Sequence, residues 1–271
     1  MSVKKLRLGL IGKDVSKSSS GRIHNFILRQ FGVECDYEKV SCSHAELDSV
    51  LRKLLGDFDG FNVTIPYKRE VFEYLEGIQG DAMACGAVNT VISSTRQGYN
   101  TDGVGFLLML STAGFTVKGK SVLVLGAGGS GRSSAVALKN AGAKVSMYQR
   151  NREKLNETCE QLGVHAATDP EAGGYDLLVN CTGVGMHDTE GQSPVTKKAF
   201  AGASAAVDLI YEPKESGFLK LAKEQGLKTL NGASMLFYQA YFADCLFLGR
   251  EPSEAEAKTF YENYLKSKTE E

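Results

Sequence analysis

Side chains that can bind and react with a ligand gather in four short polar strings within the first 103 residues. Each string is predicted to lie at a strand end or a strand–helix junction, and parallel sheets bind ligands at the carboxyl ends of their strands. Together the strings offer hydroxyls, amides, one lysine and one carboxylate. This set suits a small, polyhydroxylated, anionic substrate. The strings are Ser18-Ser19-Ser20, Asn62-Val-Thr64-Ile-Pro66-Tyr-Lys68, Ala87-Val-Asn89-Thr90 and Asn100-Thr101-Asp102-Gly103.

Most of these side chains also have a structural interpretation. Taken alone, Lys68 is a solvated residue at the start of a helix, and Asp102 is a helix cap. Asn62 and Asn100 are interpreted as turn residues with a structural role. Gln239 is harder to explain in this way, because it lies on a strongly apolar helix where a buried amide needs a partner.

A glycine string in the middle of the chain fits the dinucleotide-binding pattern G-x-G-x-x-G. Strand-forming residues, Ser121–Leu125, precede it and a helical segment follows. Glycines let the backbone turn tightly and approach a pyrophosphate, which then meets the N–H groups of the helix N-terminus. The alternative, a purely structural turn, is weaker in this context. The string is Gly126, Ala127, Gly128, Gly129, Ser130 and Gly131.

The residues after the next strand favour NADP over NAD. An acidic residue about 20 positions after the glycine string would hold a ribose 2′-hydroxyl, but the chain has Gln149, Arg150, Asn151 and Arg152, followed by Lys154. A guanidinium such as that of Arg150 can pair with a 2′-phosphate through two hydrogen bonds. A merely solvated basic helix start is a weak alternative, because cations are unfavourable there unless an anion is bound. We therefore predict that Arg150 and Lys154 bind the cofactor.

Composition argues against several other classes of partner. The 271 residues include 31 basic and 32 acidic ones, and this balance does not favour bulk binding to nucleic acid or to an anionic membrane. No run of about 18 apolar residues predicts a membrane span. The four histidines lack metal-ligand spacing, so we expect no metal site, and His24 is interpreted as a core residue. The six scattered cysteines are expected to be free thiols in a cytoplasmic protein.

Alternating strand and helix patterns predict an α/β fold. The first part of the chain is expected to form parallel strands with helices on both faces of the sheet. The predicted strands are 6–12, 36–42 and 59–66, and the predicted helices are 20–32, 44–56 and 68–77.

A second, longer series of strands and helices predicts a doubly wound sheet of Rossmann type. It begins with a strand that runs into the glycine turn, over 120–131. The remaining predicted strands are 144–150, 175–183, 205–211 and 228–230, and the helices are 132–140, 152–163 and 216–226.

Two predicted helices at 233–249 and 253–266 follow this series with no strand between them. We expect them to pack back on the first domain, and residues 102–113 to form the helical link in the other direction. The predicted division is a substrate-binding domain of residues 1–103, completed by 233–271, and an NADP-binding Rossmann domain of residues 104–232. A cleft between the two domains is expected to hold the site.

The chain resembles the shikimate dehydrogenase family in seven strings that share the order and spacing of that family. The resemblance covers nearly the whole chain, and the NVTIP-x-K and NTDG strings are the most specific. It implies an N-terminal α/β substrate domain with a mainly parallel sheet beside a Rossmann domain. The strings are GFNVTIPYK, AVNT, YNTDGVGF, GAGGSG, VNCTGVGM, DLIYEP and NGASMLFYQA.

The resemblance implies NADP-dependent interconversion of 3-dehydroshikimate and shikimate. Lys68 and Asp102 would form the catalytic pair: the lysine donates a proton to the forming alkoxide in reduction, and Asp102 orients it. The cofactor supplies the hydride. The protein must bring nicotinamide C4 close to the carbinol carbon of the ring and must transfer one proton. The implied binding residues are Ser18 and Ser20 for the carboxylate, Thr64, Asn89 and Gln239 for ring hydroxyls, and Tyr211 and Gly232 near the nicotinamide, with Tyr211 also counted as a substrate contact.

The first motif departs from the family pattern. The family has a proline near position 14, a histidine before the first serine and a proline after the second, whereas this chain has Asp14, Lys17 and Gly21. Both serines remain, so carboxylate binding is expected to persist. Without the prolines the loop is expected to be more flexible, and Lys17 offers an additional charge.

Other functions remain open at this point. One is quinate oxidation, which needs room for an extra hydroxyl, and another is a non-catalytic, ligand-sensing relative. A methylenetetrahydrofolate dehydrogenase-like enzyme shares the two-domain plan, but the NTDG string and Gln239 argue against it. The expected partner is a small-molecule substrate, with the protein a monomer or a homodimer.

Overall fold

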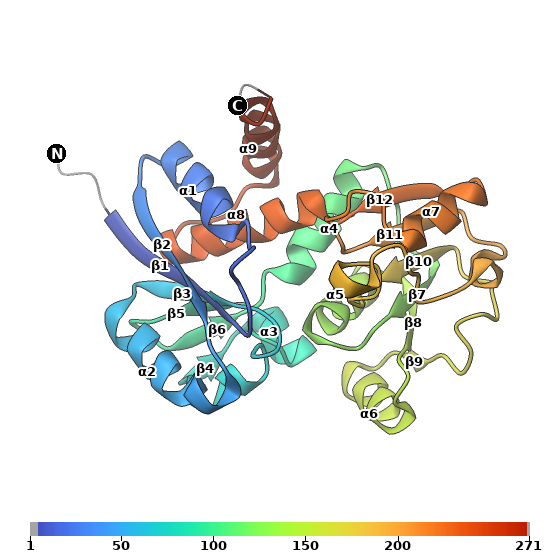
Figure 1. Cartoon of the computed structure of the whole chain (residues 1–271), viewed down its shortest axis with the longest axis horizontal. Coiled ribbons are helices and arrows are strands. Elements are labelled where there is room, and N and C mark those ends of the chain that lie inside the picture. Colours follow the sequence, from blue (N-terminus) through green and yellow to red (C-terminus); the bar gives the residue numbers. More distant parts are fainter. Residues whose placement is uncertain (1–4, 270–271) are drawn as a thin grey trace. The chain divides into compact units, whose positions relative to one another are not determined.

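The computed structural model describes residues 5–269, which form two compact units. Unit 1 contains the residues up to Gly105 and those from Leu236 onward, and unit 2 is Phe106–Met235. The chain passes between them within helices α4 (Asp102–Thr112) and α8 (Ala233–Leu248) (Figure 1). These boundaries lie two and three residues after the predicted limits at 103 and 232.

Unit 1 contains a six-stranded sheet in the order β2-β1-β3-β5-β6-β4. The strands β1, β2 and β3 are mutually parallel, with β1 between the other two. The strands are β1 (Lys5–Gly12), β2 (Glu34–Ser41), β3 (Gly60–Val63), β4 (Gly77–Ile78), β5 (Thr90–Ile92) and β6 (Gln97–Tyr99). The helices are α1 (Ser20–Gln30), α2 (Leu47–Asp57), α3 (Gly80–Cys85) and α9 (Glu254–Ser267), with short 3₁₀ turns η1 (His44–Glu46) and η2 (Glu70–Tyr74).

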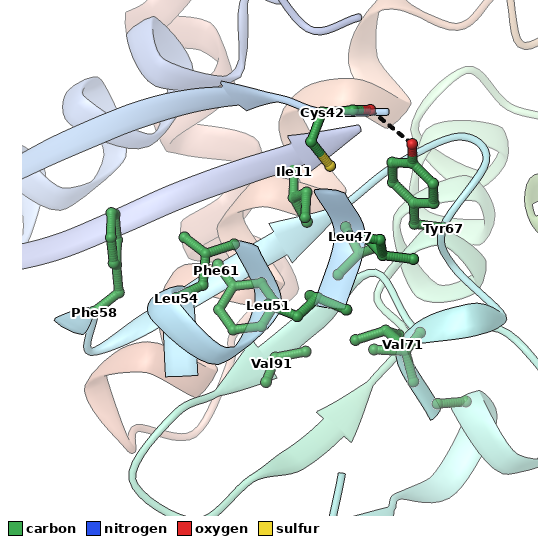
Figure 2. Close-up of a cluster of buried hydrophobic side chains, with 13 residues drawn as sticks. Ile11, Cys42, Leu47, Leu51, Leu54, Phe58, Phe61, Tyr67, Val71 and Val91 are labelled. Atoms are coloured by element: carbon green, nitrogen blue, oxygen red, sulfur yellow. Dashed lines mark hydrogen bonds between the residues drawn. The ribbon is translucent and has the colours of Figure 1, made fainter. Parts of the chain in front are cut away.

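Strand β1 is apolar along one face, while its other face begins with the exposed Lys5 and Arg7 and is buried only from Gly9 onward. Leu6 and Leu8 pack with Leu28 of α1 on one face of the sheet. Ile11 points to the other face and packs in a cluster with α2, which contributes Leu51 among others. Figure 2 shows this second cluster, in which the Tyr67 hydroxyl donates a 2.6 Å hydrogen bond to the carbonyl of Cys42.

Helix α9 and the part of α8 from Leu236 onward belong to unit 1, and both contact α1. The Phe26 ring of α1 lies 5.2 Å from that of Tyr264 on α9. Nδ1 of His24 is 2.6 Å from Oδ1 of Asp244 on α8, and both side chains are almost fully buried. Burial raises the pKa of the Asp244 carboxyl to about 6, and the interaction with His24 opposes that rise.

The second half of the unit 1 sheet differs from the prediction of parallel strands alone. Strand β5 pairs antiparallel with both β3 and β6, and β4 then pairs parallel with β6. These strands have two or three residues each, too few to show an alternating pattern, and the sequence analysis did not predict them. The sheet is therefore mainly parallel, with an antiparallel β5–β6 hairpin inserted.

The helix predicted over 68–77 is also wrong. The chain instead forms a turn around Lys68 followed by the 3₁₀ helix η2 (Glu70–Tyr74). The backbone carbonyl of Lys68 accepts a 2.7 Å hydrogen bond from the amide of Val88, outside the segment. A tertiary contact thus uses a carbonyl that a helix would have used internally.

Unit 2 contains a fully parallel six-stranded sheet in the order β12-β11-β10-β7-β8-β9. Read from the first strand of the unit, this is the Rossmann order 3-2-1-4-5-6, and the predicted fold class is confirmed. The strands are β7 (Ser121–Leu125), β8 (Lys144–Tyr148), β9 (His165–Ala166), β10 (Leu177–Asn180), β11 (Ala205–Asp208) and β12 (Lys228–Asn231). The helices are α5 (Gly129–Asn140), α6 (Arg152–Leu162) and α7 (Gly217–Glu224), with 3₁₀ turns η3 (His187–Thr189) and η4 (Lys197–Phe200).

Within residues 5–269 no helix is long and apolar enough to cross a membrane. The same range contains no group of three or more His, Cys, Asp or Glu side chains arranged to hold a metal ion.

Candidate active site

Lys68 and Asp102 form a buried ion pair in unit 1. The distance from Nζ of Lys68 to Oδ2 of Asp102 is 2.5 Å, and the two side chains are only 10% and 7% exposed. Asp102 begins α4, while Lys68 lies in the turn after β3. Lys68 is therefore not the solvated helix residue of the structural alternative.

The β5–β6 hairpin brings these two segments together. Antiparallel pairing sets Asn62 of β3 opposite Thr90 of β5, and Thr90 opposite Tyr99 of β6. As a result the beginning of β5 and the end of β6 lie beside the carboxyl end of β3. Asn89, just before β5, and Asp102, shortly after β6, are thereby placed at the edge that carries Lys68.

Asn89 is the most highly connected polar side chain of the site, and it is buried. Its Nδ2 donates to Oδ1 of Asp102 at 2.9 Å, to Oγ1 of Thr101 at 3.0 Å and to Oε1 of Gln239 at 3.3 Å. Its Oδ1 accepts from the backbone N–H of Thr101 at 2.9 Å. Asp102 thus accepts from Lys68 on one oxygen and from Asn89 on the other, which holds the carboxylate in one orientation.

Gln239 reaches this cluster because helices α4 and α8 approach closely at Gly105. A Cβ at position 105 would lie 2.7 Å from the backbone nitrogen of Gln239, a separation that only glycine avoids. The Gln239 Nε2 donates to the carbonyl of Leu236 at 2.9 Å, which leaves Oε1 facing Asn89. The sequence signal for this contact was a glycine inside an apolar helix.

Ser18 and Ser20 lie together at the start of α1. The Ser18 hydroxyl donates to Oγ of Ser20 at 3.0 Å, and the Ser20 backbone N–H donates to Oγ of Ser18 at 3.2 Å. Thr64 lies after β3, with its methyl group against Gly12 of β1, where a Cβ would come within 2.6 Å of that methyl.

The loop that contains Asp14 and Lys17, which departs from the family pattern, is held in place by hydrogen bonds. Oδ1 of Asp14 accepts from the N–H and the hydroxyl of Ser16, at 3.0 and 2.7 Å. Nζ of Lys39 donates to the carbonyl of Ser16 at 2.5 Å, and the N–H of Val15 donates to the hydroxyl of Ser41 at 3.0 Å. The Lys17 side chain is exposed.

The glycine string has the geometry of a pyrophosphate site. Gly126 follows β7 with a φ of +99°, and the carbonyl of Gly126 packs so tightly against Gly131 that no Cβ fits there. Gly128 is the extended N-cap of α5, and a Cβ on it would meet no atom within 4 Å. A helix N-terminus whose N-cap is a glycine, with open space at the Cβ position, fits a dinucleotide pyrophosphate bound by backbone N–H groups.

Arg150 and Lys154 are exposed on either side of the N-terminus of α6. In the described part of the chain neither side chain has a hydrogen-bond or ion-pair partner. Arg152 between them is used differently, because its guanidinium donates to the carbonyls of Ala167 and Thr168. This arrangement leaves two cations available to an anion beyond β8.

Tyr211 and Gly232 follow β11 and β12 in unit 2. Tyr211 is half-buried, and burial raises the pKa of its hydroxyl above the usual value. The Leu209 carbonyl packs so closely on Gly232 that a Cβ has no room.

Two polar residues of unit 2, Asp208 and Asn180, were missed by the sequence analysis. The buried Asp208 carboxylate accepts from Ser216 Oγ at 2.5 Å, Asn180 Nδ2 at 3.1 Å and the Ile210 backbone N–H at 3.0 Å. Burial raises the pKa of Asp208 despite these bonds. They fix the turn that carries Tyr211, and the one available signal was a carboxylate ending an apolar strand.

Comparisons with known proteins point to the same family as the seven sequence strings do. Residues 10–91 match the model of the shikimate dehydrogenase substrate binding domain. The shikimate dehydrogenase (NADP(+)) of Thermus thermophilus is 37% identical over 249 residues, covering 91% of this chain and 94% of that protein. This chain belongs to the shikimate dehydrogenase family.

Other members of the shikimate dehydrogenase family match over the same extent. The shikimate dehydrogenase (NADP(+)) of Carboxydothermus hydrogenoformans is 37% identical, covering 90% of this chain and 92% of that one. The crystal structure of the Thermus thermophilus enzyme in complex with NADP(H) and shikimate has a TM-score of 0.86 and 35% identity, covering 95% of this chain and 99% of that one. Family membership decides against the methylenetetrahydrofolate dehydrogenase alternative.

Proposed function

We propose that this protein is an NADP-dependent shikimate dehydrogenase that interconverts 3-dehydroshikimate and shikimate. The observation that carries the proposal is the buried Lys68–Asp102 pair, joined through Asn89 to Gln239. A buried ammonium with one fixed carboxylate partner is suited to proton transfer at a sugar-like hydroxyl. Family membership and relatives named for NADP and shikimate support the same reaction.

The polar groups around the pair provide complementary substrate contacts. Ser18 and Ser20 carry hydroxyl donors for a carboxylate, and Thr64 carries a further hydroxyl for the ring. Asn89 and Gln239 are the further proposed partners of the ring hydroxyls, and Nε2 of Gln239 carries a second N–H beyond the one that donates to Leu236. Hydrogen bonds from several directions would fix the ring relative to Nζ of Lys68, which is the positioning that catalysis requires.

The proton step uses Lys68 and Asp102. In reduction, Nζ of Lys68 donates its proton to the oxygen that develops into the alkoxide. In oxidation, the neutral amine accepts the hydroxyl proton while the C–H electron pair leaves as hydride. Asp102 holds Nζ by its Oδ2 and is itself held by Asn89. Bound NADP supplies the hydride acceptor or donor.

The proposed cofactor residues lie in unit 2. The glycine string of Gly126, Ala127, Gly128, Gly129, Ser130 and Gly131 would hold the pyrophosphate on backbone N–H groups. Arg150 and Lys154 would bind the 2′-phosphate. Gly232 and Tyr211 would line the nicotinamide site. Position 232 has no room for a side chain, because the Leu209 carbonyl packs against it.

The proposed reaction is tested by measuring cofactor reduction by the purified protein in four combinations, shikimate or quinate with NADP⁺ or NAD⁺. We expect the highest kcat/KM for shikimate with NADP⁺. A higher kcat/KM for quinate would assign the enzyme to the quinate alternative. Absence of turnover in all four combinations, with shikimate still bound, would favour a ligand-sensing relative and refute the proposal.

Arg150 gives a separate prediction on cofactor choice. Replacing Arg150 with Ala removes a charged donor, and a hydrogen bond to a charged group contributes about 1.5–3 kcal/mol. The KM for NADP⁺ should therefore rise roughly 10- to 150-fold, while the KM for NAD⁺ changes little. Steady-state kinetics with both cofactors measures the ratio.

Arg152→Ala is the matched control for this prediction, because Arg152 lies two residues away but donates to backbone carbonyls. It should leave the preference for NADP⁺ over NAD⁺ nearly unchanged. An equal loss with both cofactors in Arg150→Ala would remove Arg150 from the phosphate site. So would a wild-type enzyme that uses NAD⁺ as well as NADP⁺.

We also propose that the enzyme works in the cytoplasm as a monomer or homodimer. All six cysteines are free thiols in the structure, which supports a reducing compartment. Its expected partner is the small-molecule substrate.

A further inference from the structure

A buried carboxylate, that of Asp208 at the end of β11, joins three segments at the carboxyl end of the unit 2 sheet. Its Oδ2 accepts a 2.5 Å hydrogen bond from Oγ of Ser216, the N-cap of α7. Its Oδ1 accepts from Nδ2 of Asn180, which ends β10, at 3.1 Å, and from the backbone N–H of Ile210 at 3.0 Å. Asp208 and Asn180 are fully buried, and Ser216 is 1% exposed. The carboxylate is thus closed off from any ligand, but its three donors lie on three different segments.

Asn180 connects Asp208 to the loop that follows β10. Its Oδ1 accepts from the backbone N–H of Thr182 at 3.0 Å and from Oγ1 of Thr182 at 2.7 Å. Its Nδ2 donates to the carbonyl of Val184 at 3.3 Å as well as to Asp208. The N–H of Val184 in turn donates to Oγ1 of Thr182 at 3.2 Å. Because both hydrogens of the amide have an acceptor and its oxygen has two donors, the Asn180 side chain is held in one orientation.

The turn after β11 connects Asp208 to the proposed nicotinamide residues. Ile210 donates its N–H to Asp208, and its carbonyl accepts a 3.1 Å hydrogen bond from the N–H of Gly232. Tyr211 is the next residue along the chain. Gly185, in the loop after β10, packs on the same turn, since a Cβ there would lie 3.3 Å from Cδ1 of Ile210. One carboxylate therefore holds the backbone that places both Tyr211 and Gly232.

We propose that Asp208 is a positioning residue that holds the loop after β10 and the turn before Tyr211 in the shape needed by the nicotinamide half of NADP. The inference rests on the proposed function, in which Tyr211 and Gly232 line the nicotinamide site. The proposed 2′-phosphate contacts lie beyond β8, which is separated from β11 by β10 and β7 in the sheet. The placing of the nicotinamide should therefore depend on Asp208, and the binding of the adenosine half should not.

Asp208→Asn tests this role, because it keeps the shape of the side chain and replaces one acceptor oxygen with a donor. The new NH₂ group would face either the Ser216 hydroxyl or the two N–H donors of Asn180 and Ile210, so at least one link is lost or reversed. Since hydride transfer is sensitive to small errors in placing the reacting carbons, kcat/KM for NADP⁺ should fall roughly 10- to 100-fold. The inhibition constant of 2′,5′-ADP, which has the adenosine and the 2′-phosphate but no nicotinamide, should stay within about twofold of the wild-type value.

Ser216→Ala is a second, milder variant of the same network. It removes one donor to Asp208, while Asn180 and Ile210 still hold the other oxygen. We expect kcat/KM for NADP⁺ to fall by a smaller factor, roughly 3- to 10-fold, with the inhibition constant of 2′,5′-ADP unchanged. If thermal unfolding shows that Asp208→Asn does not fold, Ser216→Ala decides the question by the same two quantities.

Two controls match these substitutions. Asp176 also uses its carboxylate to join neighbouring strands of this sheet, because it accepts from the backbone N–H of Ser121 at 2.8 Å, but it lies at the amino ends of β7 and β10. Ser253 is the N-cap of α9 in unit 1, as Ser216 is of α7. Asp176→Asn and Ser253→Ala should therefore keep the wild-type values of kcat/KM for NADP⁺ and of the inhibition constant for 2′,5′-ADP.

The inference is overturned if a folded Asp208→Asn enzyme keeps the wild-type kcat/KM for NADP⁺. It is also overturned if the inhibition constant of 2′,5′-ADP rises by the same factor, because the variant would then have lost the cofactor site as a whole. An equal effect of Asp176→Asn would have the same consequence. Absence of shikimate oxidation in the wild type would refute the proposed function, whereas an active wild type with an unaffected Asp208→Asn variant would refute only the role of Asp208.

Discussion

Replacing Lys68 with Ala is expected to lower kcat for shikimate oxidation by roughly 10²–10⁴-fold, the usual contribution of a positioned acid–base group. Nζ lies 2.5 Å from Asp102 in a buried site, and the other side chains of the cluster are amides and a hydroxyl, which transfer protons poorly. The KM for NADP⁺ should barely change, because the proposed cofactor residues lie in unit 2. Steady-state kinetics at saturating cofactor separates the two effects.

Lys120→Ala serves as the control for the loss of a lysine. Lys120 also pairs with an aspartate, Asp176, at 3.1 Å, but the side chains are 45% and 39% exposed and belong to unit 2. Its kcat should equal that of the wild type. A Lys68→Ala enzyme with near-normal kcat and only a higher KM would make Lys68 a binding residue and would require another route for the proton.

Asp102→Asn is expected to lower both kcat and stability. The Lys68 ammonium would remain buried beside a neutral amide, and breaking a buried ion pair costs about 3–5 kcal/mol. The ammonium would also lose the carboxylate that orients it, so kcat should fall by roughly 10²-fold or more. Urea unfolding and steady-state kinetics on the same preparation measure the two losses.

Asp176→Asn provides the corresponding control, because Asp176 accepts from Lys120 in an exposed pair, which contributes little to stability. It should retain the wild-type kcat. A stable Asp102→Asn enzyme with kcat within about threefold of the wild type would show that the carboxylate has no part in the reaction.

Much of the fold could be predicted because long elements carry strong periodic patterns. β1 is a run of eight residues with a buried leucine at every second position from Leu6 to Leu10, and the strand–glycine–helix sequence around Gly126–Gly131 predicts the Rossmann turn. The β5–β6 hairpin could not be predicted in this way. Its strands have three residues each, and tertiary pairing with β3 determines where they form.

Asn89 reaches the edge of the sheet near Lys68 by a route that the sequence analysis did not predict. The sequence argument placed all the polar strings at the carboxyl ends of parallel strands. Asn89 instead precedes β5, and it reaches the same edge because β5 runs antiparallel to β3. Asn62 was interpreted as a turn residue, but it lies within β3 and bonds Tyr37 and Thr90.

Partners distant in sequence were the least accessible part of the site. The contact of Gln239 with Asn89 joins residues 150 positions apart and depends on the close approach of α8 to Gly105. Tyr37 belongs to a strand whose side chains mostly alternate between half-buried and exposed, so its pattern gives no sign of its hydrogen bond to Asn62. Such contacts depend on how the elements pack in three dimensions, and the spacing of apolar residues along the chain does not predict them.

The most direct test of the central claim is the kcat for shikimate oxidation with saturating NADP⁺ in the wild type, Lys68→Ala, Asp102→Asn and the double variant. If the buried pair handles the proton as one unit, the double variant should lose much less than the product of the two single losses. A loss equal to that product would mean that Lys68 and Asp102 act independently, and it would contradict the pair as the catalytic centre of this enzyme.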